Sequence, residues 1–102
     1  MKKSIHFKAL INYKSAEKGG SVSPISAGFR ASFQFSFELK TYIGVHVFEE
    51  DDLIYAGDSS TLDITLVDAE GFVSKLHKGL DFEILDNSGN IIGTGIVTEV
   101  YS

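Results

Sequence analysis

Hydrophobic and polar residues alternate strictly between positions 31 and 40, which is the clearest pattern in the chain. Three phenylalanines and a leucine occupy every second position, with serine, glutamine, glutamate and lysine between them. A period of two is typical of a β-strand with one buried and one solvated face, because successive side chains point to opposite sides. We therefore predict a strand here, with Phe33, Phe35 and Phe37 in the core.

Five further segments alternate in the same way or are rich in β-branched residues, which favour strands. These segments are residues 5–13, 42–48, 60–67, 80–85 and 91–101. Polar, glycine-containing turns separate them. The strongest turn signal, at residues 86–90, combines Asp, Asn and Gly and predicts a hairpin between the last two strands.

Six strands without a long helical period predict an all-β fold. Closing them into a six-stranded antiparallel barrel would remove the exposed edges that an open sheet leaves. Gly44, Gly93 and Gly95 lie inside strand patterns, where glycine often marks a bend or a close approach of the backbone. Residues 69–75 are expected to form a short helical turn. The length of 102 residues suits one domain, spanning residues 1–102.

Composition excludes several classes of site. The chain has no cysteine, so disulfides, thiolate metal sites and a cysteine nucleophile are excluded. The net charge of −5 argues against a protein that binds nucleic acid by bulk phosphate neutralisation. Residues 1–40 carry a net charge of +5 and residues 41–102 a net charge of −10. We favour an interleaving of the two halves in the fold over a basic patch that faces an acidic partner.

No motif predicts catalysis, a cofactor or a metal. The Gly93–Thr94–Gly95 sequence lacks the Lys-Ser/Thr of a phosphate-binding loop, so no nucleotide site is expected. His6, His46 and His77 are not spaced as metal ligands, and surface or half-buried positions are expected for all three. No serine lies in a nucleophile elbow. We therefore expect a protein that is not an enzyme.

The start of the chain and its apolar segments predict a cytoplasmic protein without membrane contact. No apolar run approaches the roughly 20 residues of a membrane-spanning helix. The basic residues near Met1 are not followed by the apolar stretch of a signal peptide.

Short motifs occur in a specific order along the whole chain. They are His6-Phe7-Lys8-Ala9, Gly19-Gly20 before Pro24, Gly28-Phe29-Arg30, Phe33-Gln34-Phe35, Gly57-Asp58 before residues 62–66, residues 79–84, and residues 92–100. This ordered set resembles the C-terminal domain (domain III) of elongation factor Tu. The resemblance implies a six-stranded antiparallel barrel, in agreement with the strand patterns.

The resemblance also implies a contact surface. In the family, the segment that matches Gly28, Phe29 and Arg30 lies at the seam with the GTPase domain, which makes these three residues candidates for binding a partner protein. A structural alternative is that Gly28 permits a turn, Phe29 packs and Arg30 makes a local ion pair. The chain has no counterpart of the GTPase domain, so we expect no GTP binding.

In the family, this barrel also contacts the T-stem side of aminoacyl-tRNA. Where the family has an Arg-Thr-Thr stretch, this chain has Ser36-Phe37-Glu38. Where it has an Arg-Glu-Gly-Gly turn, the chain has Asp86-Asn87-Ser88-Gly89, and a basic position is replaced by Asp68. Loss of cations weakens phosphate contacts. We predict a free-standing, non-catalytic domain that contacts a protein partner, with the translation machinery as the candidate. A weak tRNA- or RNA-binding module is the alternative.

Overall fold

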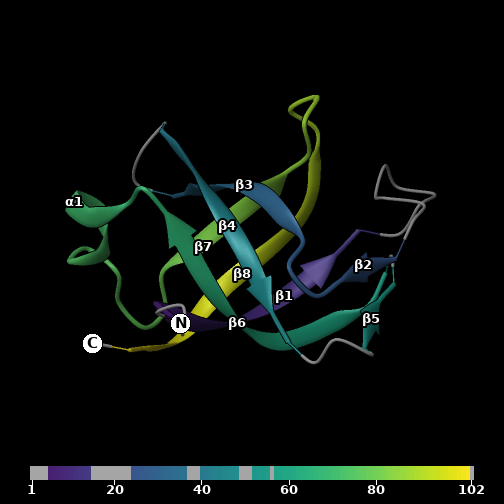
Figure 1. Ribbon diagram of the computed structural model, residues 1–102, viewed down its shortest axis with the longest axis horizontal. Helices are drawn as coiled ribbons and strands as arrows, with labels where there is room; N and C mark the ends of the chain where they lie inside the picture. The colour runs from purple at the N-terminus through teal and green to yellow at the C-terminus, as the bar shows by residue number, and fades with distance from the viewer. Residues whose placement is uncertain (1–4, 15–23, 37–39, 49–51, 56, 102) are drawn as a thin grey trace.

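Six antiparallel strands close into a barrel in the computed structural model, which describes residues 5–14, 24–36, 40–48, 52–55 and 57–101 (Figure 1). The strands are β1 (Phe7–Tyr13), β3 (Arg30–Phe35), β4 (Thr41–Val47), β6 (Ser59–Val67), β7 (Asp81–Leu85) and β8 (Ile91–Val100). They are hydrogen-bonded in the order β1-β6-β4-β3-β7-β8, and β8 pairs with β1 to close the barrel. The predicted fold class is confirmed.

Two small elements lie at opposite ends of the barrel. A ribbon of β2 (Ile25–Ser26) and β5 (Leu53–Ile54) lies at one end, and the helix α1 (Glu70–Val73) lies at the other (Figure 1). The helix confirms the predicted helical turn. The ribbon was not predicted, because strands of two residues show no period.

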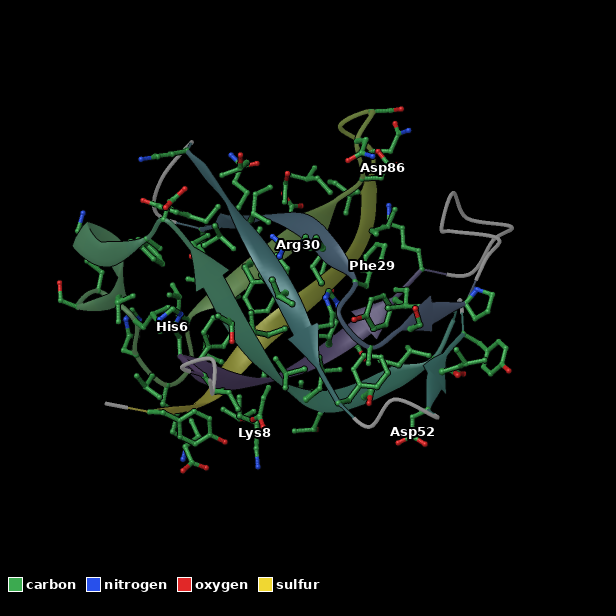
Figure 2. The ribbon with its side chains drawn as sticks, viewed as in Figure 1. His6, Lys8, Phe29, Arg30, Asp52 and Asp86 are labelled. Carbon is green, nitrogen blue, oxygen red and sulfur yellow. The ribbon has the colours of Figure 1, made fainter. Side chains whose placement is uncertain are left out.

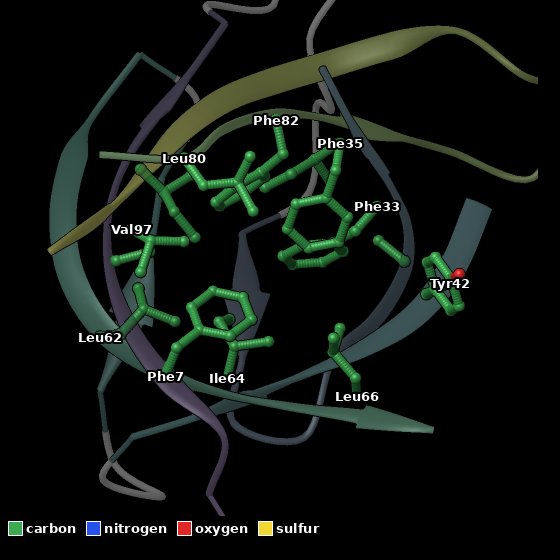
Figure 3. Packing of buried hydrophobic residues seen from close by; sticks show 14 of the residues in the cluster. Phe7, Phe33, Phe35, Tyr42, Leu62, Ile64, Leu66, Leu80, Phe82 and Val97 are labelled. Atoms are coloured by element: carbon green, nitrogen blue, oxygen red, sulfur yellow. The ribbon is translucent and has the colours of Figure 1, made fainter. Parts of the chain in front are cut away.

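Aromatic rings and aliphatic side chains fill the barrel interior (Figure 3). Phe33 and Phe35 are 0% and 1% exposed, which confirms two of the three predicted core phenylalanines; Phe37 lies outside the described residues. The ring of Phe82 stacks on Phe33 at a centroid distance of 5.0 Å and lies 5.4 Å from Phe35. From α1, Phe72 adds a ring 4.6 Å from Phe35. The rings from β3, β7 and α1 thus pack together in the barrel core.

Two glycines inside strands make room for these rings. A Cβ at Gly44 would lie 2.5 Å from Cε1 of Phe33, and a Cβ at Gly95 would lie 2.5 Å from Cζ of Phe82. Both rings are buried and have little freedom to move away. The prediction that these glycines mark close approaches is therefore confirmed.

The predicted hairpin connects β7 and β8. Its turn is held by Asp86, whose Oδ1 accepts hydrogen bonds from the backbone N–H groups of Ser88 and Asn90, each 2.9 Å long. Gly89 adopts a φ of +84°, which residues with a side chain rarely tolerate. Hydrogen bonds from backbone N–H groups, first that of Asn90, hold the pKa of Asp86 below its ordinary value. The tip of this hairpin is therefore negatively charged at neutral pH.

The basic and acidic halves of the chain interleave at β1. Lys8 lies opposite Asp63 of β6 on one side and opposite Glu99 of β8 on the other. At this position the charges partly compensate, as predicted.

Candidate functional site

The segment Gly28–Phe29–Arg30 forms a turn that leads into β3 (Figure 2). Gly28 adopts a φ of +86°, and the N–H of Phe29 donates to the carbonyl oxygen of Ser26 over 3.1 Å. Phe29 is half-buried and packs against the core, whereas Arg30 is exposed as the first residue of β3. The turn and the packing fit the structural alternative, while the exposed guanidinium leaves Arg30 accessible to a partner.

His46 holds this segment in place from the neighbouring strand β4. The N–H of Gly28 donates to the carbonyl oxygen of His46 (2.8 Å), and the N–H of His46 donates to that of Phe29 (2.9 Å). Nδ1 of His46 lies 3.1 Å from the same Phe29 oxygen. The imidazole of His46 and the ring of Phe29 meet edge-to-face at a centroid distance of 5.2 Å. Because a carbonyl oxygen only accepts, Nδ1 must carry the imidazole proton.

The expectation that His46 is a surface or half-buried residue was wrong, because its side chain is 0% exposed. The alternation of β4 places Tyr42, Gly44 and His46 on the inner face and the β-branched Ile43 outside. Burial lowers the pKa of His46 to about 4, opposed in part by its hydrogen bond to Phe29. The imidazole is therefore neutral at neutral pH. His6 is half-buried and His77 exposed, as expected.

Two buried polar atoms lie behind this turn. Among the described residues, neither Nε2 of His46 nor the hydroxyl of Tyr13 has a hydrogen-bond partner. The two rings lie 6.0 Å apart, and burial raises the pKa of the Tyr13 hydroxyl. Both groups are thus neutral in a mainly apolar barrel end, where an added charge would find no described counter-ion.

An open groove of about 710 Å³ lies on the outer face of four neighbouring strands, β1, β8, β7 and β3. Two aligned rows of outward side chains cross it. The first row runs Asn12, Thr94, Glu83, Gln34, and the second runs Ile96, Asp81, Ser36. The residues between them in sequence, such as Phe82, point into the core. The groove is therefore lined by the solvated face of the strands.

Apolar side chains border this groove where the alternation predicts polar ones. Leu10 of β1 and Ile96 of β8 lie directly opposite each other and are 37% and 41% exposed. Sequence reasoning missed both. The signal in the sequence was an apolar residue at an outward-facing position of each strand. Leu10, for example, lies between the inward-facing Ala9 and Ile11. None of the predicted candidates Gly28, Phe29 and Arg30 lines the groove.

Within the part of the chain that the structure describes, no group of three or more His, Asp or Glu side chains is placed to hold a metal ion. No described helix has the length and apolar character needed to cross a membrane. Comparison with models of known protein families gave no match for this chain.

Proposed function

We propose that this chain is a free-standing, non-catalytic β-barrel that acts by binding another protein, with a component of the translation machinery as the candidate partner. Translation takes place in the cytoplasm, and the proposal includes this location. The motif order, which resembles that of domain III of elongation factor Tu, favours the translation machinery as the partner. The surface of the barrel supports the contact itself.

The observation that carries the proposal is the exposed apolar pair Leu10–Ile96 at the border of the groove. Isolated exposed hydrophobic residues are normal on protein surfaces. Two such residues directly opposite each other beside a concave, polar surface instead favour a protein–protein contact, because interfaces combine an apolar centre with a polar rim. The pair lies on strands whose inner faces are fully packed, so its apolar side chains are not required by the core.

The filled interior supports a role without catalysis. Small closed barrels of this kind have room inside only for their own side chains. Here the interlocked rings of Phe7, Phe33, Phe35 and Phe82 occupy that space. A binding function is left to the outer faces and the two barrel ends.

The proposal is tested by affinity capture from native lysate with the tagged chain, with and without RNase. We expect a captured protein that survives RNase treatment and then binds the purified chain directly. Replacing Ile96 by threonine should weaken that direct binding by roughly 1–2 kcal/mol, a factor of about 5–30. The binding constants are measured by isothermal titration calorimetry.

Ile43→Thr is a matched control for Ile96→Thr. Ile43 is also 41% exposed, but β4 and β8 are separated by two strands in either direction around the barrel. The two isoleucines therefore lie on opposite sides, and Ile43→Thr should leave the binding constant unchanged. Capture that depends entirely on intact RNA would refute the proposal and favour the RNA-binding alternative.

Binding of tRNA is expected to be absent or weaker than about 1 μM at roughly 150 mM salt. A strong salt-dependent affinity typically needs about six to ten phosphate contacts. Among the described cations, Lys8 already faces two carboxylates, and the hairpin tip presents the ionised Asp86. A fluorescence titration with aminoacyl-tRNA measures the affinity. Binding tighter than this limit that is lost on charge reversal at Lys8, Lys40 or Arg30 would contradict the protein-contact proposal.

A further inference from the structure

The groove brings three kinds of chemistry together on neighbouring strands. Ile96 of β8 lies between Leu10 of β1 and Asp81 of β7 in the strand register, so an apolar pair adjoins a carboxylate. Glu83, two residues along β7, faces the same side. Thr94 and Asn12 continue the row that contains Glu83 and supply hydroxyl and amide groups.

Among the described residues that line the groove, no cation accompanies its two carboxylates. Asp81 and Glu83 are both exposed, and the lining residues that the structure describes include no Lys, Arg or His. Two residues along one strand separate their Cα atoms by about 7 Å, so a single bound cation can interact with both. The groove is thus an acidic site next to an apolar one.

We infer that this groove binds an arginine-bearing segment of a partner protein, with the guanidinium between Asp81 and Glu83 and its methylene stem on Ile96. An arginine side chain combines the two chemistries that the groove offers, because its stem is apolar and its head is charged. The planar guanidinium also presents several N–H donors that can reach two carboxylates, whereas the ammonium of lysine is a compact point charge. The inference rests on the proposed protein-binding function and names the chemistry of its partner.

The charge of the groove selects against nucleic acid as the occupant. Phosphate groups of RNA would meet two carboxylates and, among the described lining residues, no cation. Arg30 of a second copy of this chain would satisfy the same chemistry, since it is exposed at the start of β3. Self-association through the groove is therefore an outcome that the experiment must detect.

The test is an NMR titration of the ¹⁵N-labelled chain with the capped peptide Gly-Arg-Leu-Arg-Gly. We expect saturable shift changes centred on the amides of Asp81, Glu83 and Ile96. The same peptide with citrulline in place of arginine keeps the shape of the side chain without its charge, and it should bind more weakly. The double variant Asp81→Asn with Glu83→Gln should weaken peptide binding by about tenfold or more, because charge-assisted hydrogen bonds are lost.

A second double variant, Asp52→Asn with Asp68→Asn, removes the same charge outside the groove. Both aspartates are exposed, and Asn tolerates the positive φ of 53° at Asp68. This control should bind the peptide as tightly as the parent chain. Equal binding of the citrulline peptide, shift changes centred elsewhere, or equal loss in both double variants would overturn the inference. So would a concentration-dependent sedimentation coefficient that the groove variant abolishes, which would identify a second copy as the occupant.

The failure of this inference is distinguishable from failure of the proposed function. If a captured partner binds the Asp81→Asn/Glu83→Gln variant as tightly as the parent chain, the groove assignment is wrong and the protein-binding function stands. If no protein is captured without RNA, the proposed function is wrong whatever the peptide does.

Discussion

Replacing Phe35 by alanine is expected to lower the free energy of unfolding by about 3–5 kcal/mol. Phe35 is 1% exposed and contacts rings from three other elements, namely Phe7, Phe82 and Phe72. The change removes burial of a large apolar surface and leaves a cavity that the surrounding strands cannot close. Small domains have a free energy of unfolding of about 5–15 kcal/mol, so this loss would remove much of the stability. Denaturation by urea, followed by circular dichroism, measures the effect.

Phe29→Ala is the comparison for this prediction. Phe29 is only partly buried at the barrel end, so its truncation should cost clearly less than that of Phe35. If Phe35→Ala does not fold, Phe35→Leu should show a smaller loss in the same direction. If both Phe35→Leu and Phe35→Ala unfold at the same urea concentration as the parent chain, the side chain of Phe35 is not in the core.

The barrel could be predicted because its signals are local. The Phe33–Phe35 alternation, the aspartate-containing turn at residues 86–90 and the glycines at positions 44 and 95 each specify a strand, a turn or a close approach from nearby residues alone. Closure followed from counting six strands and avoiding free edges. The ends of the barrel were less predictable, because β2 and β5 are too short to show a period.

The orientation of β4 depends on a contact that lies outside its own sequence. Ile43, Val45 and Val47 are more hydrophobic than Tyr42, Gly44 and His46, yet the latter set forms the inner face. The ring of Phe33 on β3 needs a position without a side chain opposite it, and Gly44 provides that position. This requirement turns His46 inward, and hydrophobicity alone could not have revealed it.

The candidate groove was equally hidden from the sequence. Leu10 is far from Asp81 and Ile96 in the chain, and the three residues become neighbours only through the register of β1, β7 and β8. That register includes shifts at Lys8/Ala9 and at Ile84/Leu85, which no local pattern specifies. The segment Gly28–Arg30, by contrast, became a candidate through the family resemblance, which depends on short motifs of adjacent residues.

Acidification from pH 6.5 to pH 4 is expected to destabilise the protein through His46 by up to about 3 kcal/mol. Burial lowers the pKa of this imidazole in the folded state to about 4, from an ordinary value of 6.5. Between these two values the unfolded chain binds a proton that the folded chain does not, so stability must fall as the pH falls. The full contribution is present above pH 6.5. Urea denaturation at a series of pH values between 7.5 and 4 measures it.

The variant His46→Asn isolates this contribution from that of the carboxylates, which also titrate at low pH. Asparagine keeps an N–H donor for the Phe29 carbonyl but cannot be protonated, so the variant should lose stability less steeply on acidification, even if it is less stable at pH 7.5. His77→Asn removes an exposed histidine and should retain the slope of the parent chain. The pKa of His46 is shifted by burial and by the hydrogen bond to Phe29 alone, so no described carboxylate compensates the imidazolium. Identical slopes for His46→Asn and the parent chain would show that His46 is solvated or paired in solution.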